Sequence, residues 1–203
     1  MNNAEQVYAF VASKVSSLQS RSDTGKTAAL ARLRRAVGKA VGSVPEVWEY
    51  IYDGLPDEIE AEMKQRQHAA SASPSEVAIQ TALSLYAMHS QGNDGMNSKT
   101  AGSLGRAIGL LKYRNPTNEA GIKRRFDALA TAKTPEELIY HARGIIQLLK
   151  QGEVMLDYPG FAKDLYFMQL GGDAAKRIQR KWGRDYYGNF SEDKSNESKA
   201  RQL

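Results

Sequence analysis

Side chains that could carry out catalysis are scarce in this 203-residue sequence. It contains no cysteine, which excludes thiol catalysis, disulfide bonds and thiolate metal sites. The three histidines have no partner at a metal-ligand spacing, and we expect His68 and His89 to be surface residues. His141 is equally isolated in the sequence. No pairing of a nucleophile with a base is recognisable, so the pattern predicts a protein that is not an enzyme and has no metal and no cofactor.

Two short segments resemble functional motifs without meeting their requirements. Residues 25–27, GKT, end like a phosphate-binding loop, but that loop needs a glycine five residues earlier, after a strand. Ser20 occupies that position, and a predicted helix precedes it. Asp157 is a lone carboxylate before Tyr158 and Pro159, which is typical of the start of a helix. Neither segment therefore predicts nucleotide binding or catalysis.

Basic residues form the clearest functional pattern, because they gather on helical faces in the stretches 26–39, 106–125 and 176–184. The chain has a net charge of +5 and a pI near 9.3. This balance favours an anionic partner, either nucleic acid or an acidic membrane surface. The sequence thus predicts a binding protein.

The predicted helix 24–41 carries five basic residues and no acid. Arg32, Arg35 and Lys39 share the face opposite its apolar stripe. Like charges on one helical face repel each other, and phosphate groups would relieve that repulsion. We therefore interpret this unpaired face as a contact for nucleic acid rather than as a merely solvated surface.

Residues 100–130 form the most distinctive stretch, two predicted helices joined by a turn at Asn115-Pro116. Gly102, Arg106 and Gly109 share the face opposite the apolar stripe of the first helix. Glycine weakens a helix, so two glycines beside an arginine indicate that something bulky approaches the backbone. A bound partner and a crossing helix both fit. The basic side chains of the stretch are Arg106, Lys112, Arg114, Lys123, Arg124 and Arg125.

Apolar stripes with the helical period recur along the chain, and no segment alternates like a strand. They predict an elongated all-α protein of about eight or nine helices, with Trp48 in the core. A Gly- and Asn-rich loop separates two packed helical bundles, residues 1–90 and 100–188, and residues 189–203 read as a disordered tail. The N-terminus has no secretory pattern and no apolar run spans a bilayer, so we expect a soluble, cytoplasmic protein.

Five segments, taken in order, resemble one family. They are Ala31–Ala36, Ser103–Ala107, Lys123–Phe126, Val154–Pro159 and Lys181–Gly188. Each is short, but together they span nearly the whole chain and are similar to the CasB family, the small subunit of the type I-E CRISPR Cascade complex. The chain departs from the family pattern in a longer region 53–72 and in its C-terminal tail.

The resemblance implies a non-catalytic subunit of an RNA-guided complex in antiviral defence. Two copies would contact the hybrid of crRNA and target DNA and the displaced strand, beside the backbone and large subunits, and would stabilise the R-loop. The binding residues implied by the matching motifs are Arg32, Arg34, Arg35, Arg106, Arg124 and Arg125. Those added from the basic helix faces are Lys39, Lys123, Arg143, Arg177, Arg180 and Arg184.

Other functions fit parts of the pattern. A free-standing helical DNA-binding regulator would need a helix-turn-helix, and helix 118–130 after the Pro116 turn imitates its second helix. A peripheral membrane protein would fit the basic, amphipathic last helix, although the apolar side of that helix is needed for the core. An enzyme with unrecognised chemistry is the remaining alternative.

Overall fold

Ten α-helices and three short 3-10 helices make up the described part of the protein. The computed structural model describes residues 2–66, 68–69, 71–93, 95–188 and 190. No strand occurs among these residues, and the one extended pairing there is an isolated bridge between Asn97 and Leu156. The predicted all-α fold is confirmed. The tail predicted for residues 189–203 lies outside the described residues, except for Phe190.

The helices follow one another with short connections. The first elements are α1 (Asn3–Gln19), α2 (Asp23–Arg35), η1 (Pro45–Val47), α3 (Trp48–Tyr52), α4 (Asp57–Gln65) and α5 (Pro74–His89). The later elements are η2 (Lys99–Ala101), α6 (Leu104–Arg114), η3 (Pro116–Asn118), α7 (Glu119–Ala130), α8 (Pro135–Gln151), α9 (Tyr158–Leu170) and α10 (Gly172–Tyr186).

Several helices begin at capping residues that the sequence indicates. Ser73 and Glu76 form a complete capping box, in which each side chain accepts a hydrogen bond from the other residue's backbone N–H. Asp157 is the N-cap of α9, and its carboxylate accepts a hydrogen bond of 3.0 Å from the Gly160 N–H. The interpretation of Asp157 as a helix-start residue is therefore confirmed.

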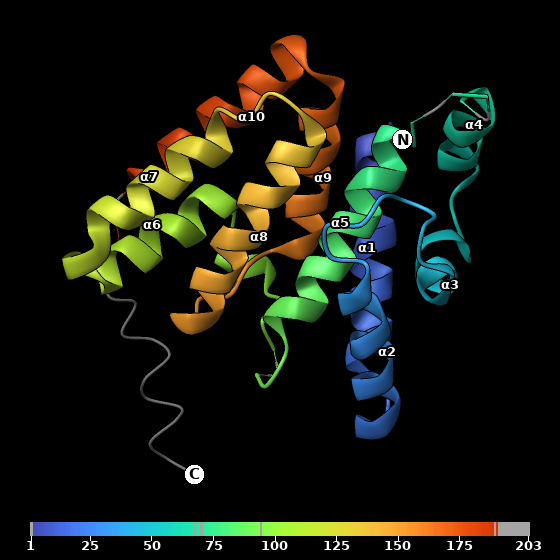
Figure 1. Ribbon diagram of the computed structural model, residues 1–203, viewed down its shortest axis with the longest axis horizontal. Coiled ribbons are helices and arrows are strands. Elements are labelled where there is room, and N and C mark those ends of the chain that lie inside the picture. Colours follow the sequence, from blue (N-terminus) through green and yellow to red (C-terminus); the bar gives the residue numbers. More distant parts are fainter. Residues whose placement is uncertain (1, 67, 70, 94, 189, 191–203) are drawn as a thin grey trace.

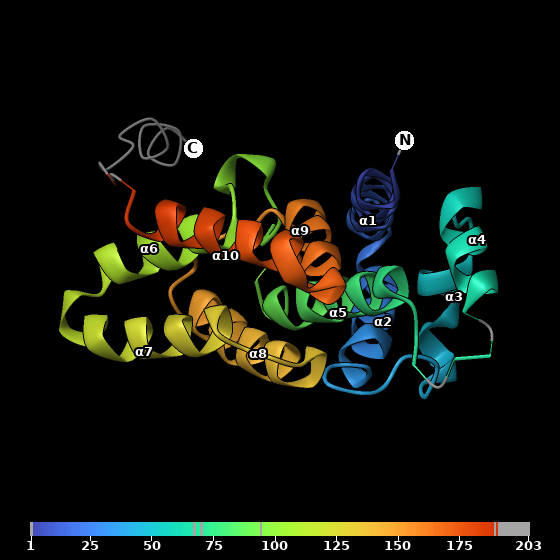
Figure 2. The ribbon, with the colours of Figure 1, turned by 90° about the horizontal axis from the view of Figure 1, so that it is seen from above.

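Helices α5 and α9 occupy the centre of the molecule (Figure 1). Helix α5 packs against α1, α2, α8 and α9, so it is buried on nearly all sides. Helix α9 packs against α1, α5 and α10 and so links early and late parts of the chain. Seen from above, α6, α9 and α10 form one layer and α7 and α8 another (Figure 2). The division into bundles 1–90 and 100–188 stays a prediction.

Helix α2 ends at Arg35, six residues before the predicted end at Val41. Gly38 and Gly42 have φ angles of 73° and 82°, in the left-handed region that glycine adopts without strain. The chain therefore turns away after Ala36, and Lys39 lies in the connection to η1 rather than on a helical face.

Two side chains occupy the opposite environment to the one predicted. Trp48 is 45% exposed, and its Nε1 donates a hydrogen bond of 3.3 Å to the Gly42 carbonyl instead of being enclosed in the core. His89 is fully buried at the end of α5, with Nδ1 2.9 Å from the Tyr158 hydroxyl. Burial, followed by the charge of Lys150, lowers the pKa of His89 to about 4. It is thus a neutral core residue at neutral pH.

The glycines of α6 mark a close crossing with α10. A Cβ atom at Gly105 would lie 2.2 Å from the Trp182 carbonyl oxygen, and one at Gly109 would lie 2.6 Å from the Tyr186 carbonyl oxygen. The ring of Phe190 would lie 2.3 Å from that same Gly109 atom. Of the two explanations for these glycines, a bound partner or a crossing helix, the crossing helix α10 is the one observed. Gly102 is not part of it, because it precedes α6 with a φ of 73°.

Within the described ranges, no helix combines the length and the apolar composition needed to cross a membrane.

Candidate nucleic-acid interface

Arg32 and Arg35 project from the open face of α2, but neither stands alone. Arg35 Nη1 lies 2.6 Å from both carboxylate oxygens of Glu46, which belongs to η1. Arg32 Nη1 lies 3.5 Å from Glu49 of α3. The prediction of an unpaired basic face on α2 is therefore wrong, because the acids come from elements further along the chain.

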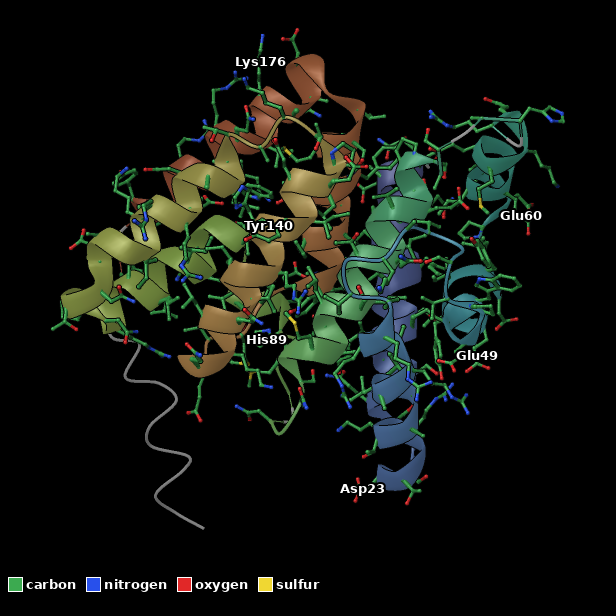
Figure 3. All side chains as sticks on the ribbon, in the orientation of Figure 1. Asp23, Glu49, Glu60, His89, Tyr140 and Lys176 are labelled. Carbon is green, nitrogen blue, oxygen red and sulfur yellow. The ribbon has the colours of Figure 1, made fainter. Side chains whose placement is uncertain are left out.

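These two ion pairs border a shallow open depression between α2 and the η1–α3 segment. Its volume is about 570 Å³. Small side chains keep it open, while the charged groups stand at its rim. It is lined by Ala28, Ala31, Arg32, Arg35, Pro45, Glu46 and Glu49. Figure 3 shows Glu49 at the end of α3 that lies beside α2.

The remaining basic residues of this region point elsewhere. Arg34 is half-buried, and its Nη1 lies 3.5 Å from the Ala87 carbonyl of α5, a long contact. The exposed Lys39 follows α2, and its own carbonyl accepts a hydrogen bond of 2.9 Å from Gln80 Nε2. The prediction that Lys39 shares the helical face of Arg32 and Arg35 is wrong, since α2 has already ended.

The 106–125 stretch places its cations on two helices. Arg106 is exposed on α6, with its guanidinium carbon 5.6 Å from the centre of the Phe190 ring. On α7, Lys123 pairs with Asp127 at 2.6 Å, and this hydrogen bond raises the pKa of Lys123. Arg124 and Arg125 are exposed beside it. These residues give α6 and α7 a positive outer surface.

Helix α8 continues the positive surface of α7. The guanidinium of Arg125 reaches over Gly144 of α8, 3.7 Å from where a Cβ atom would lie. Arg143 is exposed on the outer face of α8. Tyr140, one turn before it, is 74% exposed and stands on the outward side of α8 in Figure 3. Tyr140 was not among the residues predicted from the sequence, although it lies outside the apolar stripe of its helix.

Helix α10 carries the third predicted basic face. Arg177, Arg180 and Arg184 are all exposed. The Arg177 guanidinium also lies over the Phe167 ring, 4.9 Å from its centre. Lys181 turns away from this face and pairs with Asp164 of α9 at 2.9 Å.

Asp164 is a buried acid whose role is structural. Its carboxylate accepts hydrogen bonds from Lys181 Nζ and, at 2.8 Å, from Trp182 Nε1. Burial raises the pKa of Asp164, while Lys181 and Trp182 oppose that rise. The three side chains fasten α10 to α9. No group of three or more acids or histidines suited to a metal ion occurs among the described residues.

The predicted binding residues do not form one patch. Helix α2 lies in one half of the molecule in Figure 1, and α6, α7 and α10 lie in the other half. Figure 2 places α10 in one layer and α7 with α8 in the opposite layer. The structure brings together the cations of α7 and α8, and it separates the α2 face from the rest.

Most of the predicted cations have no acidic partner among the described residues. Arg32, Arg35 and Lys123 are the three that form ion pairs. Within the part of the chain that the structure describes, the other nine form none. They are Arg34, Lys39, Arg106, Arg124, Arg125, Arg143, Arg177, Arg180 and Arg184.

The acids that pair with α2 were missed, although a signal for them exists. Glu46 and Glu49 are three residues apart, as are Arg32 and Arg35, and residues 36–45 separate the two sets. Matching spacings of opposite charge before and after a chain reversal are compatible with two adjacent ion pairs, Arg35 with Glu46 and Arg32 with Glu49.

Comparison with known proteins identifies the family. The sequence profile of the CRISPR-associated protein Cse2 matches residues 29–187. The crystal structure of CasB from Thermobifida fusca is similar, with a TM-score of 0.70 and 29% identity, over 90% of this chain and 98% of that one. No curated protein sequence matches.

Two further crystal structures share the fold. CasB from Thermus thermophilus has a TM-score of 0.62 and 24% identity, covering 93% of this chain and all of the other. CasB from M. ruber has a TM-score of 0.59 and 21% identity, covering 96% and 98%. The profile covers well over half of the sequence, and the folds agree along nearly its full length. The resemblance to CasB is thus confirmed, and the chain belongs to the Cse2 family of CRISPR-associated proteins.

Proposed function

We propose that the protein is the small subunit of a type I-E CRISPR RNA-guided complex, Cascade, acting in antiviral defence. The observation that carries this proposal is the match of residues 29–187 to the Cse2 family. The subunit is non-catalytic and cofactor-free, works in the cytoplasm, and assembles with a second copy of itself and with the backbone and large subunits.

Its contribution is to bind nucleic acid without reading sequence. Nine of the predicted cations have no acidic partner within the described part of the chain, and eight of these nine are exposed. Arginine suits phosphate, because its planar guanidinium offers several donors and keeps its charge. Phosphate contacts supply affinity but carry no base information. We therefore assign these faces to the backbones of the crRNA–target hybrid and the displaced strand.

The energetics of R-loop formation give such contacts a role. Exchanging a DNA duplex for an RNA–DNA hybrid is nearly balanced in free energy, so modest protein contacts decide whether the open state persists. Each phosphate contact is weak and depends on salt. Helix α2 lies apart from α7 and α10, so its cations can engage a different strand from theirs (Figures 1 and 2). In this way the subunit stabilises the R-loop.

Affinity purification of the tagged full-length chain from cells that contain the CRISPR system tests the proposal. We expect other Cascade subunits and a short guide RNA to co-purify with it. Recovery of the chain alone, together with protection of one particular duplex sequence in a footprinting assay, would contradict it and would favour a free-standing DNA-binding regulator.

A further inference from the structure

Two glutamates face the two outermost arginines of α2. Arg35 Nη1 lies 2.6 Å from both carboxylate oxygens of Glu46, and Arg32 Nη1 lies 3.5 Å from Glu49. Both arginines and both glutamates are three residues apart, so one turn of α2 matches one turn of η1–α3. These four side chains together consequently present a net charge close to zero to an approaching anion.

Both ion pairs are open to solvent, so another anion can readily replace the carboxylates. The side chains of Arg35 and Glu46 are 64% and 47% exposed, and those of Arg32 and Glu49 are 51% and 55% exposed. Exposed ion pairs contribute little to stability. Each guanidinium also has five N–H donors, so a carboxylate occupies only some of them. The depression of about 570 Å³ between the pairs leaves room for an anion.

The η1–α3 segment does not depend on these carboxylates for its position. Its own side chains Val47, Tyr50 and Ile51 are buried in the core. Trp48 Nε1 is hydrogen-bonded to the Gly42 carbonyl. Apolar burial contributes more than an exposed ion pair. The two glutamates can therefore neutralise the arginines without being required for the fold.

We propose that Glu46 and Glu49 form a displaceable acidic shield over Arg32 and Arg35. The inference rests on the proposed function, in which α2 contacts a nucleic-acid backbone. Phosphates engage the full set of guanidinium donors only by displacing both carboxylates, which then remain nearby and repel the strand. A strand that presents successive phosphates overcomes this cost, whereas a single phosphate does not. The shield thus keeps the isolated subunit from binding nucleic acid tightly before assembly.

Three variants of the full-length chain test the shield. The shield variant combines Glu46→Gln with Glu49→Gln, which removes both negative charges and preserves side-chain size. Glu58→Gln with Glu60→Gln is the matched control on α4, where Glu60 pairs with Lys64 at 3.5 Å. Figure 3 shows Glu60 on α4, away from Glu49. The third variant adds Arg32→Ala and Arg35→Ala to the first.

The measurement is affinity for a labelled single-stranded DNA of mixed sequence, with melting curves to verify folding. We expect the shield variant to bind roughly five- to tenfold tighter than wild type, since two surface pairs and their repulsion no longer oppose binding. The α4 control should change little, and the gain should vanish in the third variant.

Other results would overturn the inference in distinguishable ways. Equal tightening in the α4 control would mean that net charge alone matters. Unchanged binding by the Glu46→Gln, Glu49→Gln variant, with weaker binding by the third variant, would remove the shield and leave the proposed function standing. Unchanged binding by every variant would show that α2 does not contact nucleic acid. That result would contradict both the shield and the assignment of α2 to the nucleic-acid interface.

Discussion

Single glycines set the distance between α6 and α10. The backbone of Trp182 lies where a Cβ atom at Gly105 would be, 2.2 Å from its carbonyl oxygen. Backbone atoms cannot rotate aside as a side chain can, so the two helices must separate. We expect Gly105→Ala to lower the free energy of unfolding by about 3 kcal/mol.

Gly183 on α10 provides the matched control, because beyond its chain neighbours and the backbone of its own helix no atom lies within 4 Å of where its Cβ would be. Gly183→Ala should raise the free energy of unfolding by about 0.5 kcal/mol through helix propensity. Urea denaturation of both variants makes the comparison. Equal effects would show that the crossing is not close.

The buried His89 makes stability depend on pH. Its pKa is about 4 in the folded protein, against about 6.5 in an unfolded chain. Between these values the unfolded state binds more protons, so the free energy of unfolding falls as pH falls. The contribution is intact above pH ~6.5, and about 2 kcal/mol is lost at pH ~5. Denaturation of wild type at pH ~7 and pH ~5 measures it.

A His89→Gln variant separates this effect from the titration of carboxylates. The variant is expected to be less stable at both pH values, because it loses the contact with Tyr158. Its stability should nevertheless fall less between them than that of wild type. Parallel pH profiles for the two proteins would contradict the assignment.

At the scale of elements, α10 is held to α9 by one buried acid. Asp164 accepts hydrogen bonds from Lys181 and from the buried Trp182 indole. Asp164→Ala leaves the Trp182 N–H without a partner, so we expect a loss of about 3 kcal/mol in the free energy of unfolding. Asp173→Ala, which breaks an exposed pair with Lys176, should leave the melting midpoint unchanged. Similar losses for both variants would refute this account of the α9–α10 junction.

The presence of the helices could be predicted from the sequence. The positions of their ends and the burial of individual side chains could be predicted only in some cases. Apolar periodicity and the Ser73 capping box located α1 and α5, because these signals are local. The end of α2 was missed, since two glycines outweighed the continuing apolar spacing of Val37 and Val41. The burial of His89 depends on Tyr158, and no local pattern reveals a contact 69 residues away.

For the whole molecule, the distribution of charge over the surface could be predicted from the sequence only in part. The basic stretches were recognisable, and eleven of the twelve predicted side chains are exposed. Which of these side chains lie close together in space was not recognisable, because this depends on how α2, α8 and α10 are placed around α5 and α9. The pairing of Arg35 with Glu46 likewise appears only when the chain turns back after α2.

The central claim is that these basic faces hold nucleic-acid backbone, and two matched variants isolate it. The first combines Arg32→Ala, Arg35→Ala and Arg106→Ala, which remove three exposed cations of the proposed interface. The second combines Arg21→Ala, Lys64→Ala and Arg66→Ala, which remove three exposed cations elsewhere. Both lose the same net charge, so only the position of the charge differs.

Affinity for single-stranded DNA as a function of salt concentration tests the claim most directly. The interface variant should bind all sequences more weakly, and its plot of log affinity against log salt should flatten by up to about three units, near one for each lost phosphate contact. The control should keep the wild-type slope, and both variants should melt close to wild type. An unchanged slope in a folded interface variant would contradict the claim.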